Sequence, residues 1–194
     1  VAEEARERPG LRPRRRGRAL ALEEPLELRM REDVGIEGRV GTIEAGKDPY
    51  AGREGDLWRV VPFGDREIRV RQFVPPPDPE GKPLPVVVAL HGMGGDENLF
   101  FEGYGAGLLR DLAKERRFLL VAPRTPDLAF DPAALERVLE AVLAGQGADR
   151  KRVLLLGHSL GAGVTTLFVN RRPDLLRAAC AIAGRAAGTL GAET

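Results

Sequence analysis

The chain has 194 residues, of which 43% are hydrophobic and 30% charged, and its formal net charge at pH 7 is +1. This size and composition predict one globular domain with a single core, and the balanced charge gives no indication of a nucleic-acid partner. The sequence has no run of about 18 apolar residues that could span a membrane, and two histidines and one cysteine predict neither a metal site nor a disulfide framework.

Residues 1–55 form the first predicted region. Seven arginines lie between Arg6 and Arg18 and are interrupted by prolines, a composition that cannot build a core. Glutamates offset this charge and no aromatic residues are interleaved to stack on bases, so we interpret the segment as a solvated tail. The remainder, up to residue 55, is rich in Gly, Asp and Glu and is predicted to be irregular, with at most a short helix and a short strand.

From Asp56 onward the pattern becomes regular and begins with a predicted hairpin. Residues 57–61 and 67–74 flank a turn and alternate apolar with charged side chains, as in antiparallel strands at a sheet edge. Short apolar runs typical of buried parallel strands follow at residues 86–90, 118–122, 153–156 and 178–183. Helical spacing occupies residues 107–116 and 131–145, with Asp131 as the expected cap of the second helix. The order predicts a parallel sheet with right-handed crossovers.

The only serine of the chain, Ser159, lies in Gly157-His158-Ser159-Leu160-Gly161, directly after one of these apolar runs. This is the pattern of a nucleophile elbow, in which a strand turns tightly into a helix and the flanking glycines avoid collisions. Small residues after the motif are typical of a helix that packs closely on a sheet. We therefore predict that Ser159 is a nucleophile.

A second candidate loop, His91-Gly92-Met93-Gly94-Gly95, follows the run at residues 86–90. Its backbone N–H groups could stabilise the negative charge that develops on a carbonyl oxygen during hydrolysis, and we assign this role to the amides of Met93 and Leu160. We group His91, Gly92, Gly94 and Tyr104 as residues around the substrate, with His91 chiefly a hydrogen-bonding residue that shapes the loop. A dinucleotide fingerprint would need a glycine at Glu97, so no cofactor is expected.

With these motifs the chain resembles the α/β-hydrolase superfamily, and within it the serine esterases and depolymerase-like hydrolases, over about residues 56–185. The resemblance implies that residues 56–194 form an α/β-hydrolase domain, with a mostly parallel sheet and an antiparallel hairpin at its start. Family members place an acid and a histidine after the nucleophile. The histidines here, His91 and His158, match neither position, so we expect the fold to stop after about the sixth strand, without a complete triad.

The resulting hypothesis is a serine hydrolase that cleaves small carboxylic esters through an acyl-enzyme and is weakly active or inactive as given. A peptidase or thioesterase of the same fold, or a non-catalytic binding module, would show the same motifs. The lone Cys180 is interpreted as a small buried apolar residue. The sequence leaves open whether the protein is cytoplasmic, secreted or periplasmic. It also leaves the oligomeric state open.

Overall fold

The computed structural model describes residues 48–184. These residues belong to the second of two compact units, which covers residues 42–194. The arginine-rich segment and most of the predicted first region lie outside the described residues. Within the described part, no helix is long and apolar enough to cross a membrane.

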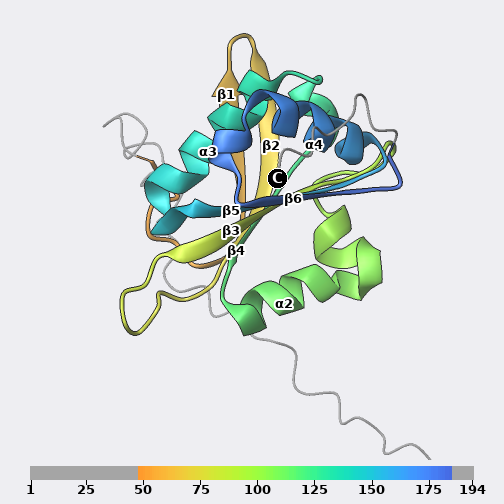
Figure 1. Cartoon of the computed structure of the whole chain (residues 1–194). Coiled ribbons are helices and arrows are strands. Elements are labelled where there is room, and N and C mark those ends of the chain that lie inside the picture. The colour runs from red at the N-terminus through yellow and green to blue at the C-terminus, as the bar shows by residue number, and fades with distance from the viewer. Residues whose placement is uncertain (1–47, 185–194) are drawn as a thin grey trace, which may run out of the picture. The chain divides into compact units, whose positions relative to one another are not determined.

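Six strands form one sheet in the described part of the chain (Figure 1). They are β1 (Gly55–Phe63), β2 (Arg66–Val74), β3 (Leu84–Leu90), β4 (Leu119–Pro123), β5 (Ala148–His158) and β6 (Ala178–Ile182). Their spatial order is β1-β2-β4-β3-β5-β6. The pairs β1–β2 and β2–β4 are antiparallel, whereas β4, β3, β5 and β6 run parallel to one another. This arrangement confirms the predicted mostly parallel sheet with an antiparallel hairpin at its start.

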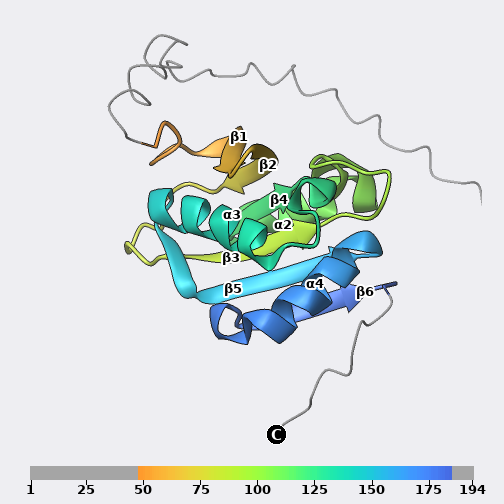
Figure 2. The same ribbon diagram turned by 90° about the horizontal axis from the view of Figure 1, so that it is seen from above.

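Among residues 48–184, three α-helices cover the two faces of this sheet. They are α2 (Leu108–Arg116), α3 (Pro132–Gly145) and α4 (Leu160–Arg171). Helices α3 and α4 lie on one face and α2 on the other, as Figures 1 and 2 show from two directions. The expected cap of α3 is confirmed, because Asp131 Oδ1 accepts a hydrogen bond from the backbone N–H of Ala133 at 3.0 Å.

The apolar residues of the central strands supply a core on each face of the sheet. Val86, Val88 and Leu90 of β3 pack with the core under α3 and α4, while Ala89 packs with the core under α2. The residues of β3 therefore alternate between two buried faces, which is why its sequence is continuously apolar. Burial of each of these valine and leucine side chains stabilises the fold by about 1.5–3 kcal/mol.

The last described strand, β6, corrects one expectation. All five of its residues, including Cys180, are exposed, so the prediction of a buried cysteine is wrong. The physical reason is position: among residues 48–184, β6 pairs only with β5 and forms an edge of the sheet.

Candidate active site

Ser159 occupies the sharp turn between β5, which ends at His158, and α4, which begins at Leu160. Its backbone has φ 53° and ψ −109°, a conformation that is strained for a residue with a side chain. The residue is exposed. Its N–H donates to the carbonyl oxygen of Ile182 at 2.9 Å, and its own carbonyl accepts from Ala162 N–H at 3.0 Å. These hydrogen bonds hold the strained turn in place.

The two glycines of the motif are required by close backbone approaches. A Cβ atom at Gly161 would lie 2.0 Å from the carbonyl oxygen of Leu90, at the end of the neighbouring strand β3. A Cβ atom at Gly157 would lie 2.3 Å from both the Gly161 carbonyl oxygen and Thr165 Oγ1. No real Cβ atom tolerates such distances. The sequence pattern therefore reflects how tightly the first turn of α4 packs on the sheet.

The loop after β3 lies directly against this turn. A Cβ atom at Gly92 would be 3.2 Å from the Ser159 Cβ and 3.1 Å from His158 Nδ1. Gly94 has a left-handed φ of 79° that favours glycine. Met93 between them exposes 76% of its side chain. Two loops separated by more than 60 residues in sequence thus meet at the carboxyl ends of β3 and β5.

The backbone N–H of Met93 belongs to the loop after β3, and that of Leu160 to the turn after β5. Neither N–H has a hydrogen-bond partner among residues 48–184. For Leu160 this follows from its position as the first residue of α4, since the first N–H groups of a helix have no acceptor within it. The partial positive charge of that helix end adds to the attraction for an anion.

His91 lies beneath the loop and is completely buried. The N–H of Thr125 donates to its Nε2 at 2.9 Å, so Nδ1 must carry the proton and donate to the Gly92 carbonyl oxygen at 2.8 Å. Both ring nitrogens are therefore used in the neutral imidazole. His91 has no surface open to a substrate, although it was grouped with the residues around the substrate, and both of its hydrogen bonds go to backbone groups.

His158 makes a contact that the sequence did not predict. Its Nδ1 is 2.7 Å from the hydroxyl of Tyr104, and the two rings meet edge to face with centroids 5.2 Å apart. Tyr104 in turn packs edge to face on Phe100, with ring centroids 4.8 Å apart. Tyr104 was expected near the substrate, and the structure brings it next to the elbow. Nothing in the sequence indicated that Tyr104 would pair with His158, because the two residues are 54 positions apart.

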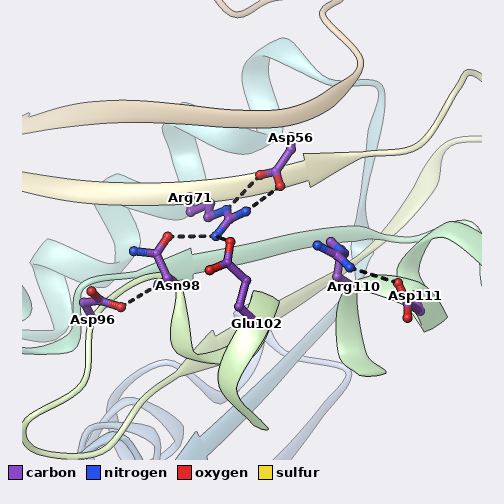
Figure 3. Close-up of polar contacts among 7 residues, drawn as sticks. All are labelled: Asp56, Arg71, Asp96, Asn98, Glu102, Arg110 and Asp111. Atoms are coloured by element: carbon purple, nitrogen blue, oxygen red, sulfur yellow. Dashed lines mark hydrogen bonds and ion pairs between the residues drawn. The ribbon is translucent and has the colours of Figure 1, made fainter. Parts of the chain in front are cut away.

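A buried arginine, also missed from the sequence, anchors the segment that carries Tyr104 (Figure 3). Arg71 of β2 is 3% exposed and binds both carboxylate oxygens of Asp56 at 2.9 and 2.7 Å. Its Nη1 donates to Asn98 at 2.8 Å and to Glu102 at 2.6 Å. Asn98 is the N-cap of the π-helical turn Leu99–Gly103, Glu102 lies within that turn, and the turn immediately precedes Tyr104. Burial alone lowers the pKa of Arg71, but hydrogen bonds to Asp56 and Glu102 outweigh it and raise the pKa above its usual value.

No group of three or more His, Cys, Asp or Glu side chains in the described part of the chain could hold a metal ion. What the residues around Ser159 can provide is an exposed hydroxyl in a strained turn, two unpaired amide donors beside it and an aromatic side chain next to the elbow. This combination suits attack on a carbonyl group.

The chain is similar to several known esterases. Feruloyl esterase B from Thermothelomyces thermophilus is 27% identical over 155 residues, which are 71% of this chain and 52% of that protein. An acetylxylan esterase from Coprinopsis cinerea is 26% identical over 157 residues, or 72% of this chain and 41% of the relative. The chain thus spans about half the length of the relatives it matches.

Solved structures show the same fold. An acetyl xylan esterase from Aspergillus awamori superposes with a TM-score of 0.56 at 21% identity, covering 68% of this chain and 53% of that one. An S-formylglutathione hydrolase from Staphylococcus aureus gives a TM-score of 0.52 at 17% identity, covering 70% and 61%. A family model described as "Alpha/beta hydrolase family" matches residues 86–193, which include both candidate loops. The chain therefore belongs to the alpha/beta hydrolase family.

Proposed function

We propose that the chain carries the nucleophile and the oxyanion site of a carboxylic ester hydrolase, with Ser159 forming the acyl-enzyme. The observation that carries the proposal is the position of Ser159: exposed, strained at φ 53° and packed against a glycine loop. Two relatives at 26–27% identity are a feruloyl esterase and an acetylxylan esterase, which supports an ester of a small carboxylic acid as the substrate class.

In this mechanism Ser159 Oγ attacks the ester carbonyl carbon and loses its proton to a base. The electron pair of the C=O bond moves to the oxygen, and the N–H groups of Met93 and Leu160 donate to the resulting oxyanion. Collapse of the tetrahedral intermediate breaks the C–O bond to the alcohol, which leaves with a proton. Water then attacks the acyl-enzyme by the same route and releases the acid.

We propose that neither His91 nor His158 is the base that takes the Ser159 proton. His91 is completely buried, and both of its ring nitrogens are engaged in hydrogen bonds with backbone groups. His158 directs Nδ1 to Tyr104. We place the histidine and acid of the triad outside these 194 residues, a proposal supported by the roughly half-length coverage of the relatives. On this basis the chain alone has a weakly activated Ser159, because serine at its ordinary pKa is a poor nucleophile.

The test is to join the chain to a homologous carboxyl-terminal segment that carries an acid and a histidine, and to measure hydrolysis of p-nitrophenyl acetate. The chimera is expected to be active, and Ser159→Ala should remove nearly all of that activity. Cys180→Ala is the matched control, because Cys180 is an exposed residue of β6 outside the elbow turn and thiols also cleave activated esters. A folded chimera that keeps its activity after Ser159→Ala contradicts the proposal.

A further inference from the structure

Two consecutive residues with left-handed backbone lie in the loop between β4 and α3. Ala129 has φ 48° and Phe130 has φ 56°. A bulky side chain in this region is a genuine outlier, because its Cβ crowds the neighbouring carbonyl oxygen. Such strain persists only where surrounding contacts enforce it, and it is concentrated at sites that bind ligands.

Contacts on both sides of the pair enforce this conformation. The preceding 3-10 turn, Thr125–Leu128, is closed by Ala129 N–H donating to the Pro126 carbonyl at 3.1 Å. Asp127 in that turn accepts from the backbone N–H of Arg69 at 3.2 Å, which fixes the turn to β2. On the other side, Asp131 caps α3. The two strained residues therefore bridge two anchored elements.

The result of this strain is that the Phe130 ring lies on the first turn of α4. The ring is 52% exposed, and its Cε1 is 3.4 Å from the position of a Cβ atom at Gly163. The N–H of Gly163 donates to the carbonyl oxygen of Ser159 at 3.2 Å, so the ring is one helical turn from the candidate nucleophile. An aromatic ring that is half exposed contributes little to the core, and burial cannot explain why it is held there.

Other exposed apolar side chains flank the same turn. Met93, in the loop against Ser159, is 76% exposed, and Ile182, whose carbonyl binds the Ser159 N–H, is 47% exposed. Exposed apolar residues next to an exposed hydroxyl are typical of a site whose ligand is largely apolar with a polar group at one position.

We propose that Phe130 is a specificity-determining residue that contacts the apolar acyl or alkoxy group of an ester bound at Ser159. The site then favours esters that carry a phenyl ring or a chain of at least four carbons over methyl acetate. This inference rests on the proposed function for one point, that the ligand is an ester. The contact with Phe130 needs only that the ester binds, and it does not need the ester to be cleaved.

The test measures ester binding to the Ser159→Ala form of the full chain, so that no turnover occurs. Phenyl butyrate and methyl acetate are titrated separately, and Kd is taken from amide chemical shifts in two-dimensional NMR spectra. Phe130→Gly is expected to weaken phenyl butyrate binding about fivefold, the scale of one lost aromatic contact, and to change methyl acetate binding less than twofold.

Ala129→Gly is the matched control, because it also places glycine at a left-handed position but keeps the ring. It should leave both Kd values within twofold of the parent, and neither glycine variant should lower the melting temperature, since glycine relieves the backbone strain. Equal phenyl butyrate affinity for the parent and a folded Phe130→Gly variant would overturn the proposal, as would the absence of binding to the parent. If the chimera experiment showed that Ser159 is not the nucleophile, the binding measurements would still stand. The two proposals can therefore be refuted independently.

Discussion

The hydroxyl of Tyr104 and Nδ1 of His158 are 2.7 Å apart and join the elbow to the segment that follows the π-helical turn. His158 also lies against the position of a Cβ atom at Gly92, at 3.1 Å. One side chain next to Ser159 therefore contacts both the candidate oxyanion loop and Tyr104. This places Tyr104 among the residues that support the turn at Ser159.

Removal of that hydroxyl should destabilise the fold modestly. Tyr104→Phe keeps the ring contacts with Phe100 and His158 but deletes the hydrogen bond, so the free energy of unfolding should fall by about 1 kcal/mol. Urea denaturation followed by circular dichroism measures the change. The control is Tyr50→Phe, which alters the other tyrosine of the chain and should change stability by less than about 0.5 kcal/mol. Equal effects of the two variants would show that the Tyr104 hydroxyl makes no net contribution.

Two glycines of α4 should respond oppositely to alanine. Gly161→Ala puts a Cβ atom against the Leu90 carbonyl oxygen, which cannot move without disturbing β3, so we expect a loss of more than about 2 kcal/mol of stability. Gly163→Ala meets only the Phe130 ring, at 3.4 Å, and should stabilise the helix by about 0.5–1 kcal/mol. Thermal unfolding of the two variants side by side tests the prediction. Similar melting temperatures would mean that α4 does not pack against β3 as described.

The Arg71 cluster should be the most sensitive polar contact of the described residues. Arg71→Met leaves the carboxylate of Asp56 without its partner in a half-buried position and should cost about 3 kcal/mol of stability. Arg110→Met is the comparison, because Arg110 pairs with Asp111 at the surface (Figure 3) and such pairs contribute about 0–1 kcal/mol. Urea midpoints of both variants give the difference. If Arg71→Met were no more costly than Arg110→Met, the cluster would not anchor the π-helical turn.

Asp127 should make stability depend on acid pH. Burial raises its pKa, but hydrogen bonds from Arg124 and Arg69 outweigh burial and hold the pKa below its usual value. A carboxyl with a lowered pKa stabilises the fold above its unfolded pKa, about 3.9, and this contribution disappears as the pH falls through the folded value. The free energy of unfolding of the parent should therefore fall more steeply below pH 4 than that of Asp127→Asn. Parallel pH profiles would contradict the assignment.

Much of the fold could be predicted because its signals are local. The β1–β2 hairpin follows from alternation around a short turn, and α3 from Asp131, Pro132 and one apolar stripe. The elbow at Ser159 was visible for the same reason, since the glycines that its geometry requires are neighbours in the sequence.

The support of the site could not be predicted, because it depends on contacts between distant residues. Arg71 looks like an ordinary charged residue of an edge hairpin until Asn98 and Glu102, 27 and 31 positions away, are brought to it. The π-helical turn that these contacts hold has no simple sequence period. Likewise, the left-handed conformation of Phe130 runs against the preference of its residue type, so no propensity rule would find it.

The hydrogen bond from the Ser159 N–H to the Ile182 carbonyl ties Ser159 to the outermost described strand pair, β5 and β6. Fraying of β6 would break that bond, free the amide of Ser159 and let the turn relax from its strained backbone angles. Exchange of this single amide hydrogen with deuterated solvent therefore reports how often the sheet edge opens. Any ligand that docks along β6 should slow that exchange, because it would keep the strand paired and the Ser159 turn in its observed conformation.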